Sequence, residues 1–376
     1  MKPQRSNILI LTCSIGSGHI SVARALADAL EKTHGDEVHV EIVDFVTDMP
    51  NFATSTTKKV YLGSLKLSRK IHKHIFSHSI DHTWPITLMN ALTMPFLQRK
   101  FKKFVEARRP DMVVSTFPVW DRLINKVWRR YSAAAPFISV ITDSISVHRV
   151  WTSGNPDYFV VPNDDTKTAL QNFDINEKRI KVFGYPLAAQ FSRPSSRSAF
   201  LKKWHLSPHK KTLLMILSTG INWSKVKKLL ARIEQSEMKN MQMVVIACGE
   251  KSWEKKLAKV KWPWPTRITG WTDDMATFIH AADVVLTKAG GATVMECIQS
   301  KKPMVIIDVL PGQELGNAVL VEKYNLGAVL SEDASDFESS LAYLLGHDAL
   351  IKRNLKAQQK PGAAADIAAF LVSLLG

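Results

Sequence analysis

The stretch from Thr287 to Asn317 has the residue types and the spacing of a nucleotide-sugar site. Gly290 and Gly291 let the backbone turn tightly and approach a ligand closely. A helix expected after this turn directs N–H groups and its positive dipole end at the turn, which suits a diphosphate. Side chains that suit sugar hydroxyls lie on that helix and in the loop after the next strand: Glu296, Gln313, Glu314 and Asn317. One strand–turn–helix unit therefore predicts a site for the phosphates and the sugars together.

Each of these residues also has a plainer interpretation. Thr293 and Glu296 match the capping box T-x-x-E, which serves a helix start without any ligand. We favour a ligand role for Glu296 because of the polar loop nearby. Lys288 beside the glycine turn is either part of the site or a surface cation. A further loop after an expected strand is predicted to contact phosphate or sugar, with a simple turn as the alternative: Ser218, Thr219 and Gly220.

Another glycine turn, Gly16-Ser17-Gly18-His19, follows the first expected strand and opens a helix. It is half of a dinucleotide fingerprint, with Ser21 in place of a third glycine and Asp44 where a ribose-binding acid belongs. An NAD site and a turn without a ligand are therefore both alternatives. His19 favours catalysis, because a helix N-terminus disfavours the imidazolium and keeps a neutral base at pH 7.

The segment Thr142–Trp151 begins at the end of a further expected strand. Asp143 and His148 are candidates for a base, or for a base and the group that orients it. An Asp-Ser turn with a surface histidine is the alternative. Trp151 is interpreted either as a core residue or as a wall facing an acceptor.

Composition limits the class of protein. The chain has 376 residues, 45% of them apolar, which suffices for two domains with buried cores. Three scattered cysteines have no metal-ligand or redox spacing and fit a reducing cytosol. No run of 18 apolar residues predicts a membrane span, and the short apolar run near the N-terminus is expected to be a strand rather than a signal peptide.

The formal net charge of +16 predicts an anionic partner. Residues 54–110 contain twelve Lys and Arg but only two acids, and apolar side chains are interleaved with the cations. That mixture favours an amphipathic patch on an anionic bilayer over a merely solvated face. We expect no nucleic-acid partner, because no zinc-finger, helix-turn-helix or RNA-binding motif accompanies the charge.

Short apolar runs alternate with amphipathic stretches, which predicts an α/β fold with parallel sheets covered on both faces. A Pro- and Ser-rich break at 186–198 divides the pattern. We therefore expect two Rossmann-like domains, over 1–186 and 187–360, with a helix in 361–376 that packs back on the first. The expected strands are 7–12, 38–43, 112–116, 137–142, 158–161, 212–217, 242–247, 267–269, 284–287 and 304–307.

The chain resembles the glycosyltransferases that make glycolipids from diacylglycerol, namely the bacterial processive diacylglycerol glucosyltransferases and the plant monogalactosyldiacylglycerol synthases. It is distantly similar to the peptidoglycan enzyme that adds N-acetylglucosamine to lipid I. The likeness covers most of the chain and is carried by LILTCSIGSGH (9–19), PDMVVSTFP (110–118), TDSISVHRVW (142–151), FGYPLAAQF (183–191), ACGE (247–250), TKAGGATVMECIQSKKP (287–303) and PGQELGN (311–317).

This resemblance implies a GT-B architecture, two Rossmann-like domains facing across a cleft, with a UDP-hexose in the second domain and a lipid acceptor at the first. By position, Glu296 binds the ribose, while Gln313 and Glu314 hold hexose hydroxyls. The diphosphate is lined by Gly290, Gly291, Ala292 and Thr293. The glycine-poor loop STGINW at 218–223 departs from the family pattern and leaves glucose, galactose and N-acetylglucosamine donors open.

The expected reaction is an inverting, single-displacement transfer of a hexose from UDP-glucose or UDP-galactose to diacylglycerol or a related lipid, with no metal or other cofactor on the protein. His19 is the first choice for the base and Asp143 the second. The enzyme is expected to be cytoplasmic and peripheral on the inner face of the cell membrane. Alternatives are a UDP-N-acetylglucosamine 2-epimerase, an NAD-dependent oxidoreductase and a non-catalytic UDP-sugar sensor.

Overall fold

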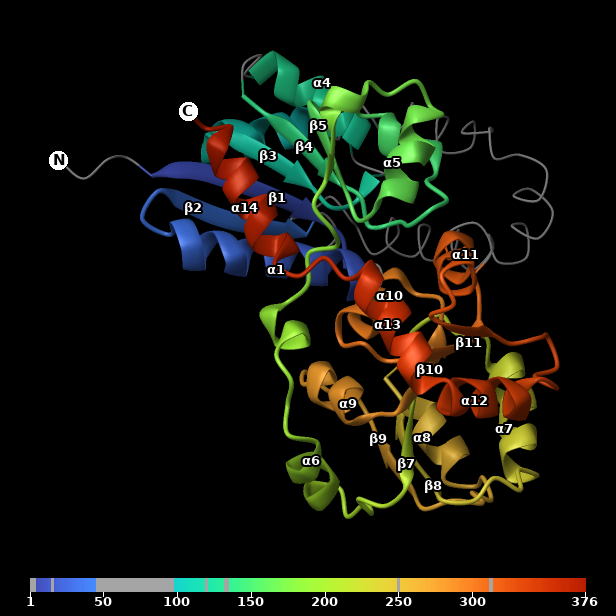
Figure 1. Cartoon of the computed structure of the whole chain (residues 1–376). Coiled ribbons are helices and arrows are strands. Elements are labelled where there is room, and N and C mark those ends of the chain that lie inside the picture. Colours follow the sequence, from blue (N-terminus) through green and yellow to red (C-terminus); the bar gives the residue numbers. More distant parts are fainter. Residues whose placement is uncertain are drawn as a thin grey trace. The chain divides into compact units, whose positions relative to one another are not determined.

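The computed structural model describes residues 5–14, 17–44, 98–118, 121–131, 135–248, 251–310 and 314–376 (Figure 1). The chain forms two compact units. Unit 1 comprises Met1–Ala188, Pro311–Gln313 and Gly362–Gly376, and unit 2 comprises Ala189–Leu310 and Glu314–Pro361. Most of the basic segment 54–110 lies outside the described residues, since description resumes at residue 98.

Unit 1 contains a six-stranded sheet in the order β2-β1-β3-β4-β5-β6, and every pair of neighbours is parallel. Its central strands are almost wholly buried, as expected for a parallel sheet with both faces covered. The strands are β1 (Ser6–Thr12), β2 (Val38–Asp44), β3 (Met112–Ser115), β4 (Phe137–Val140), β5 (Tyr158–Val161) and β6 (Ile180–Val182).

Helices cover this sheet, and the C-terminal helix is one of them. α14 (Ala363–Ser373) packs against α1 (Ser17–His34) (Figure 1). Phe370 of α14 also meets the rings of Tyr158 and Phe183, with centroids 5.3 Å apart in both pairs. The remaining helical segments are a helix over 98–108, α4 (Asp121–Tyr131), α5 (Asp164–Gln171), and the 3-10 turns η2 (Arg149–Thr152) and η3 (Glu177–Arg179).

Unit 2 repeats the architecture with a second parallel sheet, in the order β12-β11-β10-β7-β8-β9. Its strands are β7 (Lys211–Ile216), β8 (Met241–Ile246), β9 (Thr266–Thr269), β10 (Val284–Lys288), β11 (Met304–Asp308) and β12 (Gly327–Val329). Its helical segments are η4 (Ala189–Ser192), α6 (Arg197–Lys203), α7 (Trp223–Glu234), α8 (Lys251–Leu257), α9 (Met275–Ala281), α10 (Gly291–Gln299), α11 (Leu315–Lys323), α12 (Phe337–Gly346) and α13 (Asp348–Gln358).

All ten expected strands are present, so the predicted α/β fold is confirmed. β6 and β12 were not among the expected strands; each has three residues and lies at the edge of its sheet. Such short segments have too few residues to show a period. Within the described ranges, no helix combines the length and the apolar character needed to cross a bilayer.

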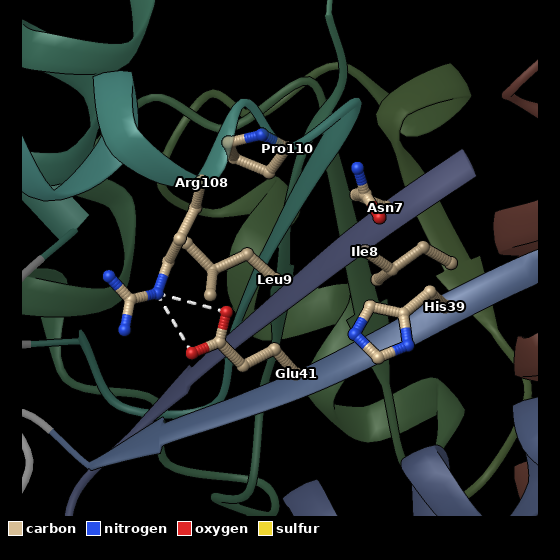
Figure 2. Close-up of a pocket in the computed structure, with 7 residues that line it drawn as sticks. All are labelled: Asn7, Ile8, Leu9, His39, Glu41, Arg108 and Pro110. Carbon is tan, nitrogen blue, oxygen red and sulfur yellow. Dashed lines mark hydrogen bonds and ion pairs between the residues drawn. The ribbon is translucent and has the colours of Figure 1, made fainter. Parts of the chain in front are cut away.

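A cavity of about 150 Å³ lies near the amino ends of β1 and β2 (Figure 2). Arg108 closes one side of it, where its Nε donates to both carboxylate oxygens of Glu41 at 2.8 and 2.9 Å. Ligands of open α/β sheets bind beyond the carboxyl ends of the strands. This cavity therefore lies at the other end of the sheet from the predicted site residues of unit 1.

Candidate functional site

In unit 2, the glycine turn between β10 and α10 is held from two sides. The register of β10 against β11 shifts between Thr287 and Lys288, where the strand ends. The N–H of Ala289 donates to the carbonyl of Asp308 at 2.9 Å, and the side-chain Nδ2 of Asn317 donates to the carbonyl of Ala289 at 2.9 Å. The backbone that precedes α10 is therefore fixed before any ligand arrives.

The capping-box interpretation of Thr293 and Glu296 is wrong. α10 begins at Gly291, and its N-cap is Gly290 in extended conformation with no side-chain capping hydrogen bond. Thr293 thus lies inside the first turn, and Glu296 lies further along the helix. Since the first N–H groups of a helix have no partner within the helix, this end of α10 suits an anion.

Glu296 is a half-buried carboxyl group on the same helix. Burial raises its pKa to about 7. Among the residues that the structure describes, none forms a hydrogen bond or ion pair with this side chain. A carboxyl group that has lost water without gaining a protein donor is well suited to accept hydroxyl groups from a ligand.

Glu314 and Asn317 flank the same turn, whereas Gln313 lies outside the described residues. Glu314 is buried and forms an ion pair with Lys288, so the interpretation of Lys288 as a surface cation is wrong. Asn317 is 3% exposed and its amide braces Ala289. Its contact with a sugar stays a prediction.

Asp308 at the end of β11 connects the glycine turn to the loop Ser218–Gly220, and sequence reasoning missed it. Its Oδ2 accepts from the N–H of Asn222 at 2.8 Å, while its carbonyl accepts from Ala289. Lys225 of α7 pairs with its other oxygen at 3.4 Å. The loop itself turns at Gly220, which has a φ of 92°. The sequence signal that could have identified Asp308 is its position as an acidic residue at the end of a buried strand.

In unit 1, His19 lies in the first turn of α1, and its ring is fixed by two other strand ends. Its Nδ1 lies 2.7 Å from the carbonyl oxygen of Thr116 and 3.2 Å from the hydroxyl of Thr142. Because a carbonyl only accepts, Nδ1 carries the proton and Nε2 keeps its lone pair. Burial lowers the pKa of His19 to about 4, against the opposing effect of the Thr116 carbonyl. The ring is therefore a neutral base at pH 7.

Asp143 and Trp151 are brought together beside His19. The indole Nε1 of Trp151 donates to Oδ2 of Asp143 at 2.7 Å. Burial raises the pKa of Asp143 to about 6, and this hydrogen bond acts in the other direction. The rings of His19 and Trp151 have centroids 6.4 Å apart, and Phe117, which sequence reasoning missed, lies edge-on to His19 at 4.9 Å.

The other candidate site residues of unit 1 that the structure describes form hydrogen bonds with the backbone or begin a helix. Nδ1 of His148 accepts from the N–H of Val150 at 3.1 Å and caps η2, so its catalytic role stays a prediction. Asp44 accepts from the N–H of Ser14 at 3.1 Å, which fixes the backbone just after β1. Ser17 and Gly18 open α1, and Gly16 lies outside the described residues.

The chain is similar to known proteins over most of its length. A family model described as monogalactosyldiacylglycerol (MGDG) synthase matches residues 19–187, and one described as glycosyltransferase family 28 C-terminal domain matches residues 222–369. A processive diacylglycerol beta-glucosyltransferase from Staphylococcus haemolyticus is 27% identical over 91% of this chain and 86% of its own length. The protein of the same name from Bacillus licheniformis is 26% identical over 93% and 90%.

Solved structures show the same fold. Acinetobacter baumannii MurG has a TM-score of 0.63 at 13% identity and covers 98% of this chain and 99% of its own. Medicago truncatula UGT71G1 complexed with UDP-glucose has a TM-score of 0.64 at 13% identity and covers 99% of both chains. A Methanocaldococcus jannaschii UDP-GlcNAc 2-epimerase reaches 0.59 at 14% identity over 98% and 100%, so the fold alone does not separate these activities. The chain is therefore a glycosyltransferase of the GT-B fold, related to the monogalactosyldiacylglycerol synthases and the processive diacylglycerol beta-glucosyltransferases.

Proposed function

We propose that this glycosyltransferase moves a hexose from a UDP-sugar to diacylglycerol or a related lipid acceptor, with inversion at the anomeric carbon. The curated relatives, which match nine-tenths of the chain, are named for transfer to diacylglycerol. UDP-glucose is bound in one structure of the same fold. These names support a transferase over an epimerase or an NAD-dependent enzyme.

One observation of the structure carries the donor half of the proposal. α10 begins at a glycine turn with no side-chain cap, and Glu296 on the same helix has no hydrogen-bond or ion-pair partner among the described residues. The N–H groups at the start of the helix suit a diphosphate, and the carboxylate suits the two hydroxyls of a ribose. The hexose then extends toward Glu314.

His19 acts in this proposal as the general base for the acceptor hydroxyl. Its Nε2 takes the proton of the acceptor hydroxyl as the oxygen forms a bond with the anomeric carbon of the hexose. The bond from that carbon to the phosphate oxygen breaks on the opposite face, and UDP leaves with the electron pair. Asp143 is the second candidate for the proton acceptor.

The leaving diphosphate gains negative charge as this bond breaks. The start of α10 presents fixed N–H dipoles to that charge, so the protein needs no reorganisation at the moment of reaction. This device takes the place of a carboxylate-bound metal ion in the proposed mechanism.

We place the enzyme in the cytoplasm, peripheral on the inner face of the cell membrane, because diacylglycerol is a membrane lipid. The cations of residues 54–110 support this location, since each cation near an anionic bilayer contributes about 1 kcal/mol of binding. No nucleic acid is needed as a partner of this charge.

The decisive experiment incubates the protein with UDP-glucose, UDP-galactose and UDP-N-acetylglucosamine, each with diacylglycerol liposomes, and weighs the lipid products by mass spectrometry. A lipid heavier by one or more hexoses is expected. Conversion of the UDP-sugar without any glycolipid indicates an epimerase, and UDP-sugar binding without turnover indicates a sensor. Either result overturns the proposal.

A further inference from the structure

The ion pair between Lys288 and Glu314 is largely buried. The two side chains are 18% and 9% exposed, whereas the pair Lys352–Asp348 on α13 is 48% and 45% exposed. A buried carboxylate without a cation is strongly destabilising, so removal of Lys288 leaves Glu314 with an uncompensated charge. The position of the Glu314 carboxylate therefore depends on Lys288.

The pair lies against the glycine turn. A β-carbon added to Gly290 would be 3.6 Å from Cε of Lys288 and 3.8 Å from Oε1 of Glu314. Both side chains thus border the backbone at which α10 begins. A ligand held by that helix end has this carboxylate as a neighbour.

The carboxylate of Glu314 is held at both oxygens. Lys288 engages Oε1, and the backbone N–H of Leu310 donates to Oε2 at 3.0 Å. A carboxylate oxygen can accept two hydrogen bonds, so each oxygen has room for one donor beyond those that the described residues supply. A carboxylate that is fixed at two points and retains two acceptor positions suits a pair of neighbouring hydroxyl groups.

We propose that Lys288 is a positioning residue for the sugar of the donor. It acts through Glu314, by fixing the carboxylate that accepts hexose hydroxyls, and it makes no contact with the diphosphate. This inference rests on the proposed function. It implies that Lys288 matters for a UDP-sugar and not for UDP alone.

The test compares kcat and KM for UDP-glucose with the inhibition constant of UDP in Lys288→Met, Glu314→Gln and the double variant. We expect each single variant to lower kcat/KM for UDP-glucose about 30-fold or more, and to change the UDP inhibition constant less than about 3-fold. The double variant should lose no more than the larger single loss, because both substitutions remove one device. Lys352→Met is the matched control for loss of a lysine ion pair, and it should change neither constant.

Lys288→Arg keeps the charge but alters the reach, so it should lose less of kcat/KM than Lys288→Met, again with UDP inhibition unchanged. Thermal unfolding verifies that each variant is folded, and Lys288→Arg decides the matter if Lys288→Met does not fold. Three results would exclude this role for Lys288. The first is UDP inhibition that weakens as much as kcat/KM falls. The others are losses of kcat/KM that multiply in the double variant, and single variants that keep the full kcat/KM. Absence of UDP inhibition in the unmodified enzyme, measured first, would instead overturn the donor site itself.

Discussion

Trp151 donates its indole N–H to the carboxylate of Asp143 across 2.7 Å, and its ring lies 6.4 Å from the ring of His19, centroid to centroid. The tryptophan is 1% exposed, so it is both a core residue and the donor that orients this acid. The interpretation of Trp151 as a core residue is therefore confirmed. Its contact with an acceptor stays a prediction.

Replacement of Trp151 by Phe removes this donor, so the pKa of Asp143 should rise above its present value of about 6. The acidic limb of the profile of kcat/KM against pH then moves to higher pH if Asp143 acts in its ionised form. A profile that is unchanged in a folded variant would show that Asp143 does not limit turnover. Trp204→Phe, in unit 2, serves as the control.

Asp143 also has a consequence for stability. Burial raises its pKa in the folded protein to about 6 from the ordinary value of 3.8, so the folded state binds more protons than the unfolded state between these values. Stability therefore falls as pH rises through this window, and the loss persists above it. Asp143→Asn should stabilise the protein at pH 7.5 relative to pH 4.5 by about 1–2 kcal/mol after allowance for partial exposure. Urea unfolding at the two pH values measures the difference.

Substitution of His19 by Ala should lower kcat by about 100- to 10,000-fold, as expected for loss of a general base. UDP inhibition should not change, because the donor is proposed to bind in unit 2. Since the pKa of His19 is lowered to about 4, the unmodified enzyme should not lose this base between pH 6 and 8. His34→Ala, near the other end of the same helix, is the control. Retention of full turnover by His19→Ala would exclude the imidazole as the base.

Glu296→Gln should weaken UDP binding by about 10-fold or more, because the amide cannot accept both ribose hydroxyls as a carboxylate does. The same change should raise stability at pH 8, since burial raises the pKa of Glu296 to about 7 and the ionised form is disfavoured in the fold. Isothermal titration and thermal unfolding measure the two effects. Intact UDP affinity together with higher stability would remove Glu296 from the site.

Chelation of divalent metals by EDTA should leave the initial rate within about 2-fold, because fixed N–H dipoles at the start of α10 are proposed to stabilise the leaving diphosphate. Rates are measured with and without added Mg²⁺ or Mn²⁺. A loss of turnover that added metal restores would replace this part of the mechanism.

Binding to liposomes should require anionic lipid and decrease with salt. The cations of residues 54–110 act over a Debye length of about 10 Å at 0.1 M salt, so 0.5 M salt should release most of the protein. Sedimentation with and without phosphatidylglycerol measures this. Unchanged binding to neutral vesicles at high salt would mean that apolar insertion, rather than charge, holds the enzyme.

The sequence by itself determined the alternation of strands and helices and the position of the glycine turn before α10. These are local properties, since a side-chain period and a glycine bend arise within a few residues of the chain. Thus the strand before each turn and the helices containing His19 and Glu296 were predicted correctly.

Only the tertiary structure decided what these residues do. α10 begins at Gly291 rather than after Thr293 because Asp308 and Asn317, on other elements, hold the preceding turn. The proton of His19 is placed on Nδ1 by a carbonyl 97 residues away, and Lys288 is made a buried partner of Glu314 by a loop 26 residues on. Hydrogen bonds and ion pairs of this kind join segments that are distant in the chain, and their partners are set by the packing of whole elements rather than by local spacing.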